Sequence, residues 1–201
     1  MTRIIETLRE EHRNIEELLL VLEHELSVFD RNERPDYEVI QGVIRYFEDY
    51  PDCCHHPKED MIFEKLQLRD SVAAESVGDL EVEHQNEGKR LRRVAQVVRS
   101  ILTDHDILRQ TFHNTMRDFI DLERKHMEME ERDLFPIAIK ALRPEDWADI
   151  EAVWSEKQDS LFNAAIEERC QSLRERILQW ERENQANWNA QRADAHTSNQ
   201  H

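Results

Sequence analysis

The sequence FHNTMRDFIDLERKHMEMEERDLFPIAIKA, residues 112–141, carries a long helical pattern. Its apolar residues recur every three to four positions, which is typical of an α-helix with one buried face. Two ionisable residues, His126 and Glu130, lie on that same face, one helical turn apart. The face consists of Phe112, Met116, Phe119, His126, Glu130, Leu134, Ile137 and Ala141. The pattern therefore predicts a helix whose buried side contains a histidine and a carboxylate.

Three other stretches repeat this feature. Their buried stripes include His12, then His55 with Glu59, then His84. Burying one unpaired ionisable group costs on the order of several kcal/mol, so these groups need a common partner. A pair of metal ions is the partner that suits all of them.

Composition limits the fold and the partners. The chain has 201 residues with only 3 Gly and 5 Pro, and helix-forming residues dominate, so we expect an all-α protein. The net charge of −17 argues against nucleic acid and anionic membranes as partners, because both require a basic face. No apolar run is long enough to span a membrane, and the first residues do not form a signal peptide. Cys53, Cys54 and Cys170 show no disulfide spacing, which fits a reducing, cytoplasmic environment.

The breaks in the pattern predict the helices. We expect them over residues 2–29, 36–66, 71–101, 106–141 and 145–183. Asp36 is the expected N-cap of the second helix, and Pro51 and Pro57 predict a kink or short break over residues 50–57. Residues 185–201 are rich in Asn, Gln, Ala, Ser and His and are predicted to form a disordered tail.

Short connections favour antiparallel neighbours, so the first four helices predict an up-down-up-down four-helix bundle. The expected organisation is a bundle over residues 1–142, a C-terminal helical extension over residues 143–184, and the tail over residues 185–201. The extension has Trp147 and Trp154 on one apolar stripe. It is expected either to cover the bundle of its own chain or to form a homodimer with a second copy.

Because successive helices are expected to run in opposite directions, the heights of the ionisable groups along the bundle can be compared. At a rise of ~1.5 Å per residue, all six ionisable groups fall roughly 14–22 Å from the same end of the bundle. They therefore lie at one level. His24 and His113 leave the stripes, His105 is further off, and His196 and His201 lie in the tail. None of these five is assigned to the site.

The donor types indicate the class of metal. Imidazoles with carboxylates in a bundle core are typical of di-iron and di-manganese sites, and zinc needs only four ligands. Asp60, Glu131 and Glu16 are either acceptors that orient ligand histidines or solvated surface residues. Cys53 and Cys54, next to the two histidines, do not make a zinc finger, because four contiguous residues cannot surround a tetrahedral ion. Packing is the expected role of these cysteines, with redox sensing as the alternative.

Four motifs in this order resemble the hemerythrin-like (HHE cation-binding) domains. The segment from His126 to Pro136 is similar to the H-x-x-x-E-E-x-x-L-F-P signature of that family. The segment from His55 to Phe63 resembles its H-H-x-x-E-E element, and Glu83-His84 followed by Gly88 resembles its third-helix motif. His12 takes the place of the first-helix ligand. The resemblance covers roughly residues 1–141.

The resemblance implies a four-helix bundle that holds two iron ions in a non-haem di-iron centre with an oxo or hydroxo bridge. Glu59 and Glu130 would be the bridging carboxylates. The candidate metal ligands are His12, His55, His56, Glu59, His84, His126 and Glu130. His56 is included because some members of the family place an additional ligand beside the second-helix histidine. The alternative for His56 is an exposed role, since it points ~100° away from His55 unless Pro57 bends the turn.

One departure bears on function. Hemerythrins use two third-helix histidines four residues apart, and here Gly88 takes the second position. The missing ligand leaves a position open for dioxygen, peroxide or nitric oxide. We expect a protein that binds or senses dioxygen or redox state. The alternatives are a di-iron enzyme that handles peroxide or nitric oxide, and an iron storage or delivery protein. No residue is identified as a catalytic acid or base, so enzymatic activity is left open.

Overall fold

The computed structural model describes residues 2–78, 80–103, 108–158 and 161–198. These residues are almost entirely helical, and no strand occurs among them. The elements are α1 (Arg3–Asp30), α2 (Tyr37–Tyr50), the π-helical turn η1 (Pro51–His55), α3 (His56–Arg69), α4 (Ser71–Val77), α5 (Leu80–Leu102), α6 (Arg109–Met129), the π-helical turn η2 (Glu130–Leu134), α7 (Phe135–Ala141), α8 (Pro144–Gln158) and α9 (Leu161–Ser198).

Local sequence signals explain most of these boundaries. The Asp36 side chain accepts hydrogen bonds from the N–H groups of Glu38 and Val39, which confirms it as the N-cap of α2. Asp70 caps α4 in the same way through the N–H of Ala73. The break expected over residues 50–57 is present as η1, which begins at Pro51.

Three predicted helices are divided in the structure. The stretch expected as one helix over residues 145–183 consists of α8 and α9. The helix expected from residue 71 is split into α4 and α5 by Gly78, whose φ of 97° is outside the helical region. The helix expected over residues 106–141 contains the π turn η2, and its predicted first residues lie outside the described ranges. The helix widens at η2, just before Pro136, because a proline has no N–H for the usual hydrogen bond to residue i−4.

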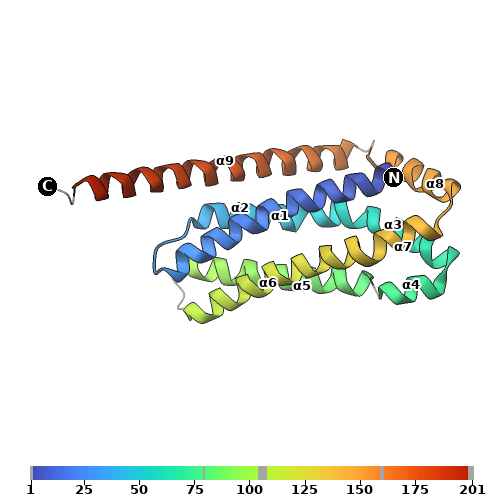
Figure 1. Cartoon of the computed structure of the whole chain (residues 1–201), viewed down its shortest axis with the longest axis horizontal. Coiled ribbons are helices and arrows are strands. Elements are labelled where there is room, and N and C mark those ends of the chain that lie inside the picture. Colours follow the sequence, from blue (N-terminus) through green and yellow to red (C-terminus); the bar gives the residue numbers. More distant parts are fainter. Residues whose placement is uncertain (1, 79, 104–107, 159–160, 199–201) are drawn as a thin grey trace.

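Four helical segments lie side by side along the long axis of the molecule, as Figure 1 shows. They are α1, α2 with α3, α5, and α6 with α7, and successive segments run in opposite directions. Within the set, α1 packs against α2 and α6, and α5 packs against α2 and α6.

The buried apolar residues form two separate clusters along this set of helices. One cluster includes Ile15, Cys54 and Leu91, and the other includes Leu8, Ile62 and Leu80. On each helix the ionisable positions identified from the sequence fall between the two clusters. The predicted level of charged groups therefore exists as a layer that divides the apolar core.

The C-terminal helix α9 lies along the outside of these four segments and packs mainly on α2. Ile177 is fully buried there, and its Cγ1 lies 3.1 Å from the position that a Cβ on Gly42 would occupy. This contact within one chain uses part of the apolar face of α9. Pairing with a second copy stays a prediction.

The backbone of α9 is helical to Ser198, which corrects the tail predicted from residue 185. Ala and Gln recur over residues 185–194, and both are good helix formers. Their propensity lets an existing helix continue.

The domain boundaries at residues 142 and 184 stay predictions. Among the described residues, no helix is both long and apolar enough to cross a lipid bilayer.

Replacing Gly42 by Leu is expected to undock α9 while the rest of the bundle stays folded. A larger side chain at this position meets Ile177, and overpacking costs about 1–3 kcal/mol. Limited proteolysis should cut α9 faster in Gly42→Leu than in the wild type. Gly88→Ala is the control, because its new Cβ meets only the mobile end of Arg92. Equal cleavage rates in all three proteins would contradict the assigned contact.

Candidate metal centre

All seven residues proposed as ligands lie together in the charged layer. They form two overlapping groups, in each of which the donor atoms lie within 4.8 Å of one another. The first group is His12, His55, Glu59 and Glu130, and the second is His56, Glu59, His84 and His126. Glu59 belongs to both groups. The fold thus brings together residues from four helical segments, although it does not by itself identify them as ligands.

The histidine Nε2 atoms point at the two central carboxylates. His12 Nε2 lies 3.3 Å from Glu130 Oε2 and 3.6 Å from Glu59 Oε1. His55 Nε2 lies 3.3 Å from the same Glu59 oxygen, and His126 Nε2 lies 3.1 Å from Glu130 Oε1. His84 Nε2 lies between the carboxylates, 3.5 Å from Glu59 and 3.8 Å from Glu130. Both carboxylates are completely buried.

These close approaches are not hydrogen bonds. All four oxygens of Glu59 and Glu130 are buried without a hydrogen-bond partner, as are the Nε2 atoms of His12, His84 and His126. Buried polar groups in proteins are nearly always paired, because an unpaired one costs about 1–3 kcal/mol. Donor atoms that converge without bonding to each other have the arrangement that cations require. The residues present therefore fit a metal centre.

The opposite ring nitrogens of four histidines are held by carboxylates. Nδ1 of His12 lies 3.1 Å from Glu131 Oε1, and Nδ1 of His84 lies 3.3 Å from Asp60 Oδ1. Metal-binding histidines commonly donate this N–H to a carboxylate, which fixes the ring and leaves Nε2 free for the metal. Of the two readings for Asp60 and Glu131, the geometry favours the orienting role. Glu16 instead pairs with Arg124.

His55 and His56 are oriented in the same way. Nδ1 of His55 lies 2.9 Å from Glu11 Oε2, and Nδ1 of His56 lies 3.2 Å from Asp52 Oδ1. Both rings are buried, and His56 stacks on His84 with ring centroids 3.9 Å apart. The π turn η1 explains how two adjacent histidines face the same site. It adds backbone before Pro57 and turns His56 inward, away from the exposed direction that a regular helix would give it.

Glu87 is a buried carboxylate of the site that the sequence analysis missed. Its Oε2 lies 3.2 Å from His56 Nε2 and 3.7 Å from His126 Nε2, and it has no hydrogen-bond partner. Glu87 follows His84 by three residues on α5 and therefore shares its face. The three-residue spacing of His84 and Glu87 is the sequence signal that could have identified Glu87. It also places a carboxylate beside Gly88, where the resemblance leaves a nitrogen ligand missing.

Glu123 lies against Glu87 and is 3% exposed. Burial and the neighbouring Glu87 carboxylate raise the pKa of Glu123 well above its ordinary value. Burial alone would also raise the pKa of Glu87, but the His56 ring, whose Nε2 lies 3.2 Å away, outweighs this effect and lowers it. The opposite directions of these two pKa shifts favour a proton on Glu123 over one on Glu87.

Lys58 is a second buried charge that was not anticipated. Its Nζ donates to Glu11 Oε1 and to the Cys54 carbonyl, each at 2.5 Å, and lies 4.5 Å from the centre of the Trp154 ring. Glu11 in turn contacts His55, and its pKa is lowered: hydrogen bonding to His55 and the Lys58 charge overcome the effect of burial. Lys58 thus keeps the carboxylate behind His55 ionised.

Electrostatics in the layer favour charged histidines when no metal is bound. Burial by itself lowers the pKa of His12, but Glu130 and Glu59 outweigh it and raise that pKa to about 10. Burial likewise lowers the pKa of His56, and Asp52 and Glu87 raise it to about 9. Burial and Glu130 raise the pKa of Glu59, yet the surrounding histidines bring it down to about 2. A metal ion would therefore replace protons in this layer.

The cysteines are not part of the cluster. Among the described residues, Cys53, Cys54 and Cys170 form no disulfide, and none belongs to either group of donors. Burial raises the pKa of the Cys54 thiol, so it is not a thiolate at neutral pH. The packing role predicted for Cys54 agrees with its place in the apolar cluster. His113 pairs with Asp30 away from the site, and His105 lies outside the described residues.

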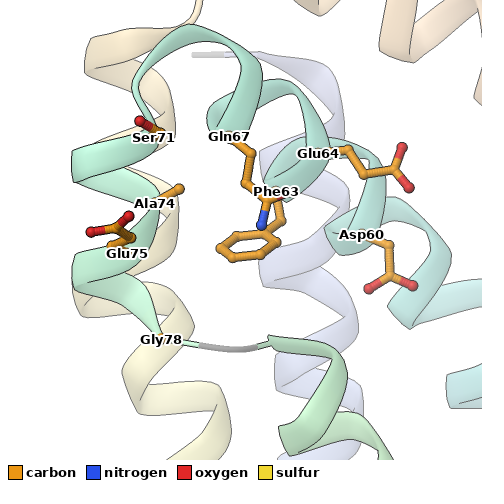
Figure 2. Close-up of a pocket in the computed structure, with 8 residues that line it drawn as sticks. All are labelled: Asp60, Phe63, Glu64, Gln67, Ser71, Ala74, Glu75 and Gly78. Atoms are coloured by element: carbon orange, nitrogen blue, oxygen red, sulfur yellow. The ribbon is translucent and has the colours of Figure 1, made fainter.

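Several cavities border the charged layer. One of about 530 Å³ is bounded by His56, His84 and Gly88, together with Lys89 and Arg92. Figure 2 shows a second, of about 870 Å³, between α3 and α4. Its lining residues are Asp60, Phe63, Glu64, Gln67, Ser71, Ala74, Glu75 and Gly78. The second cavity meets the cluster only through Asp60. The cavity beside Gly88 reaches two proposed ligands, whereas a cavity of about 250 Å³ reaches His126 and one of about 350 Å³ reaches His12.

Comparison with known proteins identifies a family for most of the chain. The profile described as the hemerythrin HHE cation binding domain matches residues 3–138. This range covers α1 to α7 up to Ala138 and includes all seven proposed ligands. No curated protein and no solved structure matches the chain.

The stability of the metal-free protein is expected to fall as the pH rises from about 6 to about 9. His12 and His56 have folded-state pKa values of about 10 and about 9, above the ordinary 6.5. Their contribution is complete below pH 6.5 and is lost as the pH passes through those values. Glu59 acts oppositely: its pKa of about 2 is below the ordinary 4.5, so its contribution is lost as the pH falls from 4.5 toward 2. Urea unfolding of chelator-treated protein across this range measures the effect, and a higher free energy of unfolding at pH 9 would contradict it.

Removing the charge of Glu87 is expected to weaken metal binding more than removing that of Glu123. The raised pKa of Glu123 favours its protonated form, so Glu123→Gln changes little, whereas Glu87→Gln removes an anion that faces His56 and His126. Metal affinity, measured by competition with a chelator, should drop at least about tenfold in Glu87→Gln, equivalent to about 1.4 kcal/mol. The same loss in both variants would show that the proton sits elsewhere.

Proposed function

The chain belongs to the hemerythrin HHE cation-binding domain family, and on this basis we propose that its buried cluster holds two iron ions that bind or sense dioxygen. The observation that carries the proposal is the convergence of unpaired Nε2 and carboxylate oxygen atoms in two overlapping groups. Glu59 contributes to both groups, and Glu130 approaches His12 as well as His84 and His126. Each carboxylate is thus positioned to bridge two ions.

The donor set favours iron. Five imidazoles and at least two carboxylates exceed the four ligands of a tetrahedral zinc ion. Nitrogen and oxygen donors of this mixture are typical of non-haem iron, and manganese is the closest competitor. We assign α1, α2 with α3, α5, and α6 with α7 to the up-down-up-down four-helix bundle in which such centres occur.

The surroundings of the centre suit a small ligand. Two iron ions would supply the electrons for reversible binding of dioxygen. The protein would hold the ions and control the access of dioxygen to them. Leu8, Ile62 and Leu80 pack on one side of the layer and keep bulk water away. On the other side, Gly88 has no side chain to fill the cavity next to His56 and His84. A molecule of the size of dioxygen can approach there.

A second candidate function is the handling of hydrogen peroxide or nitric oxide. The cavity beside Gly88 is bounded by Asp52, Lys89 and Arg92, which are all polar. Such a lining favours a ligand that forms hydrogen bonds, as hydrogen peroxide does. This feature distinguishes the site from an apolar pocket suited to dioxygen alone.

Metal analysis and spectroscopy together test the proposal. We expect about two iron ions per chain in protein from iron-supplied cells. A charge-transfer absorption should appear when the reduced protein meets air and disappear when dioxygen is removed. Oxidation that is not reversed, with consumption of added peroxide, would support the second candidate. Zinc, or one ion per chain, would contradict the di-iron centre.

The bridging role of Glu130 gives a further test. Glu130→Ala is expected to lower the iron content from about two ions to one or none. One group of donors loses an oxygen, and the other loses the carboxylate that approaches its His84 and His126. Glu128→Ala is the control, since Glu128 lies on the same helix and is exposed. Iron content is measured by mass spectrometry, with circular dichroism as a check on folding. A folded Glu130→Ala protein with two iron ions would rule out the bridge.

A further inference from the structure

A second cluster of metal-binding side chains lies where α9 crosses α1, far from the charged layer. His24 and Glu25 are on α1, and Glu181 is on α9. His24 follows His12 by twelve residues, which is roughly 18 Å along the helix. The sequence analysis placed His24 outside the buried site, and the structure agrees, since His24 joins a group of its own with Glu25 and Glu181.

Both carboxylates of this group are buried. Glu25 is 3% exposed and Glu181 is 6% exposed. Glu25 accepts a hydrogen bond from the N–H of Asp36 at 2.7 Å, and Glu181 Oε1 accepts one from the side chain of Gln185. The remaining oxygen of Glu181, Oε2, is buried without a hydrogen-bond partner. One buried acceptor is thus left open in the group.

The approach of His24 to Glu181 does not satisfy this group. Its Nδ1 lies 2.6 Å from Glu181 Oε1, but the two atoms do not have the geometry of a hydrogen bond. One donor atom from each of the three residues lies within 4.8 Å of the others. The three side chains therefore converge on a common point, as the donor atoms of the charged layer do.

Electrostatics in this group also call for a cation. Burial is the main cause that raises the pKa of Glu25 to about 7, against the lowering effect of the Asp36 N–H. The nearby carboxylates of Glu181 and Asp36 raise it further. A divalent ion between Glu25 and Glu181 would offset both the repulsion and the burial.

We propose that His24, Glu25 and Glu181 bind one divalent transition-metal ion such as Zn²⁺, and that this ion clamps α9 to α1. One imidazole and two carboxylates leave a position for water, as three-ligand zinc sites do. The imidazole selects transition metals over Mg²⁺ and Ca²⁺, which prefer oxygen donors alone. A cavity of about 850 Å³, lined in part by His24, Glu25 and Asn184, lets the ion reach the site.

The clamp would add to contacts that already join α9 to the rest of the chain, such as the ion pair of Arg174 on α9 with Glu17 on α1. Asn184, one turn beyond Glu181, donates to the Asp36 side chain at 3.0 Å, so α9 already contacts the start of α2 here. An ion bound to Glu181 on α9 and to two residues on α1 would add a stronger link. Its binding would stabilise the docked position of α9 in proportion to the ion's concentration.

Titration with Co²⁺, a spectroscopic substitute for Zn²⁺, tests the site. The protein is first loaded with iron and freed of loosely bound metal. Wild-type protein is expected to bind one further Co²⁺ per chain, with a visible absorption that Zn²⁺ abolishes. His24→Ala and Glu181→Gln should each weaken this binding at least about tenfold. His113→Ala and Glu183→Gln are the matched controls and should bind Co²⁺ as the wild type does.

Two checks separate this site from the buried centre and from misfolding. Iron content and circular dichroism should be unchanged in all variants; if His24→Ala does not fold, the isosteric Glu181→Gln carries the test. Zn²⁺ should slow proteolysis of α9 in the wild type and in the controls, and not in the two site variants. Absence of a further Co²⁺ in the wild type, or equal binding in the site variants, would overturn the proposal and leave an ion pair between His24 and Glu181.

Discussion

Two carboxylates with no exposure to solvent, Glu59 and Glu130, impose the constraint on which the rest of this structure depends. Neither has a hydrogen-bond partner, and each is surrounded by histidine Nε2 atoms at 3.1–3.8 Å. Buried anions persist only when cations compensate them. In the metal-free chain protonated histidines do this, and in our proposal the metal ions do. The charged layer therefore divides the apolar core into two clusters.

The layer is supported from outside by a second set of charges. Asp52, Asp60, Glu11 and Glu131 each face the Nδ1 atom of one histidine. Because these atoms are held, each imidazole can turn only its Nε2 atom inward. The Lys58 ammonium donates a hydrogen bond to Glu11 and favours its ionised form. This arrangement prepares the site for a metal before any metal binds, which reduces the ordering that binding would otherwise require.

The fold adjusts its helices to meet this requirement. Both π turns occur at the charged layer, η1 ending at His55 and η2 starting at Glu130. Each is next to a proline that removes a backbone N–H, so the local sequence and the geometry of the site agree. The extension beyond residue 142 follows a different logic: α9 packs on α2 through Ile177 and meets α1 through Glu181.

The sequence by itself determined the helical stretches, their buried faces and six of the residues proposed as ligands, and His56 was added through the resemblance to the family. These features depend on spacing along one chain segment: a residue such as His126 shares a face with Glu130 whatever packs against it. Only the tertiary structure decided the inward direction of His56, the closeness of Glu87 to His126, the burial of Lys58 beside Glu11, and the meeting of His24 with Glu181. The first needs a π turn that regular helical spacing does not predict. The others depend on which helices approach each other and at what height, and such contacts leave no periodic signal in the sequence.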